Sequence, residues 1–409
     1  MLLFIALANA PGLAPGGPAH GQPVETIERV ANVVLALFVQ ARAYPVFGIM
    51  LGYGMVQLAR RQEAAGASPR QVRALLQRRS AWLFAFGFVH AALLYFGDFL
   101  GAYGIIGLVA SVALLHRERI LRAILWIWTI SAVEAIGLAI AVALGFAAHH
   151  GVPATPPVDI APSSVAPDYL ASVVARLHEW VPHTLTVLPS IFIVALGMWA
   201  AERELLEDVR RHTRLLRRVA IAGLSSAVLG AVPLALVYAG IAHADAQTLA
   251  LASYLHKVSG MFGGAGYAAL LGIAAGRLTH AGTTAKRIGA ALAALGQRSL
   301  SGYLFQSLAW LTLLPPYTLA LASRFGSPLL TALTLAVVVW VVSVVGATAM
   351  RRHAWRGPAE VVLRRLTYGR ADERSRRNSP PIDDQRFAAP MRTLSDRKAP
   401  AAEVPTETV

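Results

Sequence analysis

The sequence contains no cysteine. That absence excludes disulfide bonds, thiolate catalysis and metal sites built on cysteine. Charged residues are also scarce, because Asp, Glu, Lys and Arg together make up 14% of the chain, whereas a soluble domain has about 25%. The low fraction of charged residues is therefore not typical of a soluble domain.

Long apolar runs take the place of the missing charges. Hydrophobic residues account for 56% of the chain, and several runs approach or exceed the roughly 18–20 residues that cross a bilayer as a helix. Irregular backbone cannot face lipid, and no alternating strand pattern of a membrane barrel appears. We therefore predict an all-α fold, a polytopic transmembrane helix bundle of about ten passes.

The first predicted pass is short, since its ten residues span only about 15 Å, half of the apolar core of a bilayer. We expect that the true start lies upstream or that this helix is incomplete. Residues 30–39 are expected at the membrane surface, and residues 168–180 are expected to form a short amphipathic helix on the outer surface. The predicted passes are residues 1–10, 44–59, 81–96, 99–115, 120–147, 184–201, 219–242, 251–276, one pass within 288–319, and 328–350.

The basic residues lie almost entirely on one side of these passes. The net charge is +15, and 31 of the 37 Lys and Arg residues fall in segments 60–79, 116–122, 202–218, 277–287 and 351–409. Lys and Arg are retained on the cytoplasmic side, so we predict that both termini are cytoplasmic. This placement explains the positive charge without nucleic-acid binding and predicts membrane lipids, anionic headgroups included, as partners.

The chain divides into three predicted regions. Residues 1–350 form the transmembrane domain, residues 351–370 form an interfacial amphipathic segment, and residues 371–409 form a disordered, charged cytoplasmic tail. No motif for a cofactor is present. The histidines at 149, 150, 178 and 183 do not have the spacing of a zinc site, so no metal is predicted. The sequence carries no signal for an oligomeric state.

His90 and Asp98 are ionisable residues inside the apolar, glycine-rich stretch 87–108. Such residues are costly in a membrane and mark functional sites. On one straight helix they would lie about 12 Å apart along the axis and roughly 80° around it, so they meet only if a loop folds inward or a third group joins them. We predict both as catalytic residues, with His90 as general base or proton relay. The alternative is a neutral imidazole bonded between helices and a helix-capping Asp98.

Further polar residues are predicted to contact a substrate. Arg42 has the chemistry to hold an anionic group such as a phosphate, or it extends to lipid headgroups. Glu134 lies mid-span with Lys257 as its expected partner, either as an ion or proton site or as a structural pair. A polar patch in the ninth pass either lines a cavity for a polar headgroup or bonds helices together. Its members in the predicted binding set are Arg298, Tyr303 and Gln306.

Four stretches together resemble the YeiB-like family of bacterial membrane proteins, the family that carries domain of unknown function 418. They follow one another over about 330 residues, and their order and spacing carry the resemblance. Ser301–Gly302 stand where that family usually has Thr–Asn, and its usual Arg-Gly before the first helix is absent. The stretches are YPVFGIMLGYGMVQLARR (44–61), RRSAWLFAFGFVHAALLYFGDFLGAYGIIGL (78–108), LGQRSLSGYLFQSL (295–308) and RGPAEVVLRRLTYGR (356–370).

The resemblance implies a multi-pass protein of the bacterial cytoplasmic membrane. The family has been suspected of transport and is similar in layout to polytopic membrane acyltransferases. Three functions are therefore expected: an acyltransferase-like enzyme that modifies an envelope glycan or lipid, a transporter or permease-like protein, and an envelope scaffold without chemistry.

Overall fold

The computed structural model describes residues 1–13, 26–148, 152–154, 160–278 and 282–377. Every regular element in these ranges is a helix, which confirms the predicted class. The first helices are α1 (Leu2–Asn9), α2 (Thr26–Phe38), α3 (Ala43–Ala64), α4 (Pro69–Leu93), α5 (Leu100–Ala113), α6 (Glu118–Ala148), α7 (Tyr169–Val187) and α8 (Ile191–Glu202). The later helices are α9 (Val209–Tyr238), α10 (Ala246–Leu278), α11 (Thr283–Gly296), α12 (Ser299–Leu313), α13 (Leu321–Arg324), α14 (Pro328–Arg352) and α15 (Pro358–Arg377).

Six helical stretches of the described chain are long and apolar enough to cross a membrane. Their length and composition agree with a polytopic membrane bundle. The number of passes and the cytoplasmic termini stay predictions. The six stretches are Thr26–Ala64, Glu118–Ala148, Tyr169–Glu202, Val209–Tyr238, Ala246–Leu278 and Pro328–Arg352.

Two predicted segments differ from the structure. The ninth predicted pass is two helices, α11 and α12, because the helix breaks at Gln297 and Arg298. Residues 168–180 are not a separate short helix, because α7 continues past them to Val187. They begin the continuous helical stretch Tyr169–Glu202, and Arg176 and Trp180 on it are buried.

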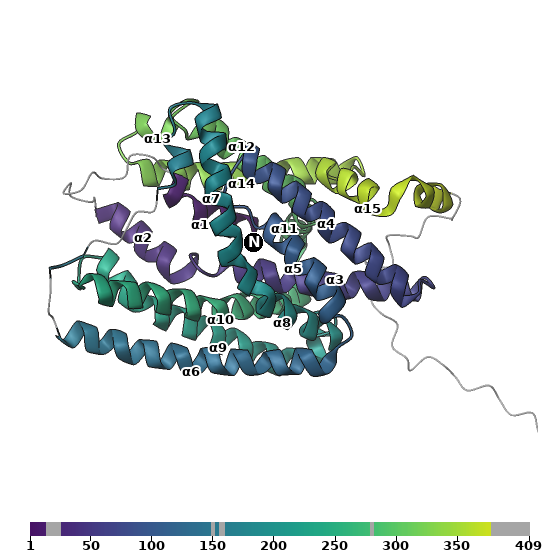
Figure 1. Cartoon of the computed structure of the whole chain (residues 1–409), viewed down its shortest axis with the longest axis horizontal. Helices are drawn as coiled ribbons and strands as arrows, with labels where there is room; N and C mark the ends of the chain where they lie inside the picture. Colours follow the sequence, from purple (N-terminus) through teal and green to yellow (C-terminus); the bar gives the residue numbers. More distant parts are fainter. Residues whose placement is uncertain (14–25, 149–151, 155–159, 279–281, 378–409) are drawn as a thin grey trace, which may run out of the picture. The chain divides into compact units, whose positions relative to one another are not determined.

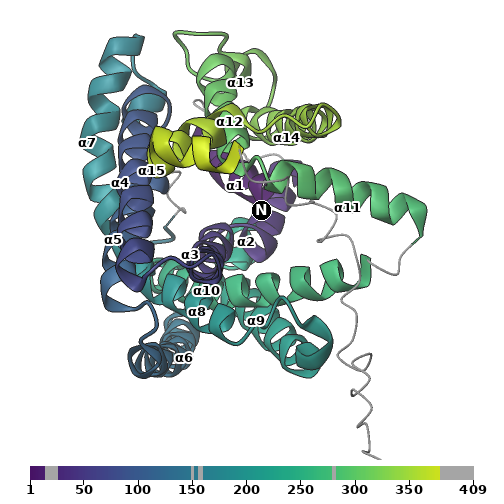
Figure 2. The same cartoon turned by 90° about the vertical axis from the view of Figure 1, so that its right-hand side faces the viewer.

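Three long helices form one side of the bundle. α10 packs against both α9 and α6, whereas α6 and α9 hardly touch each other. Figure 1 shows the three running side by side, and Figure 2 shows α6 and α9 on either side of α10. α4 and α5 form a second group with α7 packed on them.

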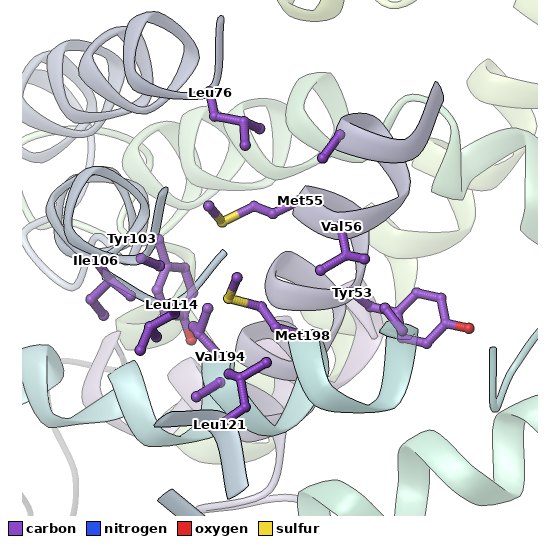
Figure 3. Packing of buried hydrophobic residues seen from close by; sticks show 14 of the residues in the cluster. Tyr53, Met55, Val56, Leu76, Tyr103, Ile106, Leu114, Leu121, Val194 and Met198 are labelled. Atoms are coloured by element: carbon purple, nitrogen blue, oxygen red, sulfur yellow. The ribbon is translucent and has the colours of Figure 1, made fainter. Parts of the chain in front are cut away.

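A buried apolar cluster lies between α3, α4, α5 and α8, which contribute most of its residues. Met55, Leu76, Ile106 and Met198 are buried in it (Figure 3). Glycines let the backbones come close here, as is common between membrane helices. A Cβ atom at Gly104 of α5, for example, would overlap the backbone of α4 at Phe84.

The first turn of α15 is tied to α12 by a carboxylate. Glu360 Oε1 accepts hydrogen bonds from the backbone N–H groups of Leu300 (2.8 Å) and Ser301 (3.2 Å). A negative charge at a helix N-terminus satisfies free N–H donors and complements the helix dipole. The carboxylate of Glu360, a residue of α15, therefore caps the neighbouring helix α12.

The compact unit that contains these helices is Met1–Thr367, and Tyr368–Val409 form a separate unit. α15 is interrupted at Gly369, whose φ of 72° and ψ of 171° are not helical. Residues 371–377 are the end of α15. The rest of the predicted disordered tail, residues 378–409, lies outside the described residues.

Two glycines of α3 provide a matched test of the α3–α8 contact. A Cβ atom at Gly52 would overlap the carbonyl oxygen of Val194, whereas a Cβ atom at Gly54 would meet nothing within 4 Å. We expect Gly52→Ala to lower the free energy of unfolding by about 1–3 kcal/mol, since overpacking a filled contact forces the backbone apart. Gly54→Ala should not destabilise the protein. Equal thermal midpoints of the two variants in detergent would contradict this packing.

Candidate functional site

His90 and Asp98 meet inside the bundle. α4 ends at Leu93, and the chain turns back into α5 at Leu100, which brings His90 Nδ1 within 2.9 Å of Asp98 Oδ1. Neither side chain is exposed, at 0% of its surface each. The separation calculated for one straight helix does not apply, because the helix ends between the two residues. An inward-folding loop, one of the two conditions set by the sequence, is what joins them.

Asp98 also caps the helix that follows it. Its Oδ2 accepts a 2.6 Å hydrogen bond from the backbone N–H of Gly101 in the first turn of α5. Its Oδ1 lies 2.9 Å from His90 Nδ1, a close contact that does not have the geometry of a hydrogen bond. Gly87 makes room for the carboxylate, since a Cβ atom there would overlap Asp98 Oδ2. The capping and the catalytic interpretations of Asp98 are therefore compatible.

The other nitrogen of His90 faces α12. Ser307 Oγ lies 2.8 Å from His90 Nε2, at hydrogen-bond distance, and both residues are buried. A hydroxyl, an imidazole and a carboxylate thus stand in line, which is the order of a nucleophile, its general base and the group that orients the base. The sequence places Ser307 in a polar patch but does not connect it with His90, which is 217 positions away.

Two buried residues of α12 beside Ser307 carry polar atoms without partners. The Tyr303 ring lies over His90, with ring centroids 4.8 Å apart, and its hydroxyl makes no hydrogen bond with a described group. Neither the amide nitrogen nor the amide oxygen of Gln306 has a hydrogen-bond partner in the part of the chain that the structure describes. A buried polar group without a partner costs about 1–3 kcal/mol. Such groups near an imidazole are donors and acceptors available to a ligand.

A small cavity adjoins this group. Its volume is about 160 Å³. It touches Tyr303 on α12 and Phe99 and Leu100, which directly follow Asp98. The remaining lining residues are Ile5, Ala8, Asn9, Ala41, Ala43, Tyr44 and Phe47.

Arg176 of α7 holds the end of α4 in place. It is buried and donates from Nη1 to the carbonyl oxygens of Leu93 (2.9 Å) and Leu94 (2.8 Å). Tyr169 Oη donates to the same Leu93 oxygen at 3.0 Å. The last carbonyls of a helix have no partner within the helix, so these donors allow the chain to turn inward toward His90. The sequence gives one indication of this role: Arg176 is one of few basic residues in the predicted outer segments.

Arg42 is not at the lipid surface, which corrects the expectation that it extends to headgroups. It is completely buried. Its guanidinium donates to the carbonyl oxygens of Ala36 (2.7 Å) and Ala227, and Nη1 lies 3.3 Å from His256 Nδ1. The two terminal nitrogens of the guanidinium are thus used on backbone carbonyls, because the α2–α3 turn draws the arginine into the bundle.

The other predicted binding residues lie apart from His90. Glu134 and Lys257 are both exposed, and no ion pair joins these two described residues, so the expected partnership does not form. Glu134 Oε1 instead accepts a 2.9 Å hydrogen bond from Tyr254 Oη. Arg298 donates to the carbonyl oxygens of Ala294 (3.0 Å) and Trp355 (3.1 Å), which is a structural role at the start of α12.

A larger groove of about 1070 Å³ lies elsewhere, along α6, α9 and α10. None of the residues predicted for a site lines it. Among the residues that the structure places, no group of three or more His, Asp or Glu side chains is arranged to hold a metal ion. The histidines at 149 and 150 lie outside the described residues.

Comparison with known proteins found a family match that includes α12. Residues 200–370 match the family described as "Protein of unknown function (DUF418)". The chain carries a DUF418 region. This supports the family assignment made from the sequence motifs. The DUF418 match includes Tyr303, Gln306 and Ser307, whereas His90 and Asp98 lie before it.

One curated relative shares part of the chain. It is "Uncharacterized protein YxaH" of Bacillus subtilis (strain 168), 34% identical over 98 residues. That alignment covers 24% of this chain, and the chain spans only 23% of YxaH. No solved structure matches this chain.

The support that Arg176 gives to the turn is testable. Arg176→Gln removes charged donors from two buried carbonyls, so we expect the free energy of unfolding to fall by at least about 2 kcal/mol. The control is Arg214→Gln on α9, where the arginine is exposed. Thermal unfolding in detergent measures both. An Arg176→Gln protein as stable as Arg214→Gln would show that the turn does not depend on this arginine.

Proposed function

We propose that this protein is a membrane-embedded acyltransferase with Ser307 as nucleophile, His90 as general base and Asp98 as the group that orients His90. The observation that carries the proposal is the buried line of Ser307 Oγ, His90 Nε2 and Nδ1, and Asp98 Oδ1. A serine is a weak nucleophile unless an adjacent base takes its proton, and a base works best when a third group fixes its orientation.

The reaction divides into two balanced transfers. Ser307 Oγ attacks the carbonyl carbon of an acyl thioester while His90 Nε2 takes the hydroxyl proton. The carbon–sulfur bond then breaks, and His90 returns the proton to the leaving thiolate. In the second transfer an acceptor hydroxyl loses its proton to His90 as it attacks the Ser307 ester, and that proton goes to Ser307 Oγ when the ester bond breaks.

The negative oxygen that develops on the acyl carbonyl needs hydrogen-bond donors. Tyr303 Oη and Gln306 Nε2 are buried, have no hydrogen-bond partner among the described residues, and lie within about one turn of Ser307 on α12. We assign them this role, with Gln306 adjacent in sequence to the nucleophile. Their unsatisfied state is the expected cost of a site prepared for a transition state rather than for the resting protein.

The proposed acceptor is the hydroxyl of an envelope glycan or lipid, reached from the bacterial cytoplasmic membrane with both termini in the cytoplasm. Support for this placement comes from the basic loops on one side of the spans and from the family resemblance. A transporter receives less support, because Glu134 and Lys257, the ionisable residues proposed for a path, are exposed on the flank of the bundle. An inert scaffold leaves the unpaired atoms near His90 without a purpose.

The proposal is tested first in the source bacterium. A strain without this protein should lack an acyl group on at least one envelope lipid or glycan, seen as a mass difference. The wild-type gene should restore the group, and a gene with His90→Gln should not, although both proteins insert. Identical envelope masses in the deleted and the wild-type strain would remove the support for acyl transfer.

A second test separates the chemistry of Asp98 from its capping role. Asp98→Asn keeps an oxygen for the Gly101 N–H but loses the charge that orients His90. We expect the rate of label transfer from an acyl thioester to an envelope extract to fall by about 10⁴-fold, as in the serine–histidine–aspartate triad. Glu134→Gln is the matched carboxylate control and should leave the rate unchanged. A full rate with Asp98→Asn would restrict Asp98 to helix capping.

A further inference from the structure

We propose that the cavity beside Tyr303 is the acyl pocket of the site and that it admits only a short, uncharged acyl group. The inference rests on the proposed acyl transfer and adds the class of acyl group. Its basis is the position, the lining and the volume of the cavity, together with the unpaired hydroxyl of Tyr303.

The position connects the cavity with the reacting groups. Tyr303 lines it and lies four residues, about one helical turn, before Ser307 on α12, so both side chains face the same side of the helix. The Tyr303 ring also lies over His90. Phe99 and Leu100 also line the cavity, and they directly follow Asp98. An acyl carbonyl at Ser307 thus has the cavity as the adjacent space for its chain.

The lining selects against charge. The described side chains that line it are aliphatic or aromatic except for Asn9 and the hydroxyls of Tyr44 and Tyr303, and none of them is an Asp, Glu, His, Lys or Arg. Burying a charged group without a partner is strongly unfavourable. An apolar chain is favoured, because each buried methylene contributes about 0.8 kcal/mol.

The volume limits the length of the chain. The cavity holds about 160 Å³, close to the roughly 150 Å³ apolar cavity that accommodates one benzene ring. A group of about six carbon atoms therefore fills it, and a long fatty acyl chain does not fit. Tyr303 Oη, buried and without a hydrogen-bond partner in the described chain, supplies the hydrogen bond that places the carbonyl end.

The test measures binding apart from turnover. Ser307→Ala protein in lipid nanodiscs is mixed with N-acetylcysteamine thioesters of acetate, hexanoate and dodecanoate, and the thermal midpoint is recorded. We expect hexanoate to raise the midpoint most and dodecanoate to leave it unchanged. An equal rise with the dodecanoate thioester would overturn the length limit.

A cavity-filling variant locates the binding. Ala43→Leu places a larger side chain in the empty space, where added volume is tolerated better than in a packed core. It should lower hexanoate affinity at least tenfold and retain acetate binding. Ala139→Leu on α6, which lines the separate groove, is the matched control. Unchanged hexanoate affinity in Ala43→Leu would place the acyl group elsewhere.

The outcomes distinguish the two proposals. Hexanoate binding that Ala43→Leu abolishes, together with an unaltered envelope in the deleted strain, would keep the pocket and reject acyl transfer. Acyl transfer that depends on His90 but has no length limit would keep the enzyme and reject the pocket.

Discussion

The buried imidazole of His90 is the constraint on which the surrounding structure depends. Away from water an imidazole needs polar groups beside its nitrogens. Here Ser307 on α12 lies at hydrogen-bond distance from Nε2, and the turn after α4 brings Asp98 Oδ1 to 2.9 Å from Nδ1. The turn has to fold inward to deliver Asp98, which requires the space left by Gly87. It also requires donors for the freed carbonyls at the end of α4, and Arg176 provides them. The burial of His90 thus accounts for the glycine on α4, the inward turn into α5, the buried arginine on α7 and the serine on α12.

The helices were predictable, because apolar runs and helix length are local properties. The site was predictable only in part. His90 and Asp98 stand out as ionisable residues in an apolar stretch. Their calculated separation on one straight helix places them too far apart for contact, because that calculation assumes that the helix continues past Leu93. The contact of His90 with Ser307 joins positions 217 apart, and no local pattern encodes such a pair. The burial of Arg42 was not predicted for the same reason, because it depends on contacts with backbone carbonyls of α2 and α9, which are distant in sequence from each other.

The site is assembled from two parts of the chain with different relationships to known proteins. Ser307, Tyr303 and Gln306 belong to the region that matches DUF418, residues 200–370. His90 and Asp98 lie upstream, within the stretch that resembles the same family by its motifs. Glu360 links the closing segment of the match to the start of α12. Substituting Glu360 would therefore act on the site through the position of α12, not through contact with a reacting atom.

The central claim is that His90 activates Ser307. The most direct measurement is covalent labelling by a membrane-permeable fluorophosphonate, which reacts with serines that an adjacent base activates, followed by peptide mass spectrometry. The account predicts an adduct on Ser307 in the wild-type protein and its loss in His90→Gln. No adduct on Ser307, or an adduct that persists without His90, would contradict it.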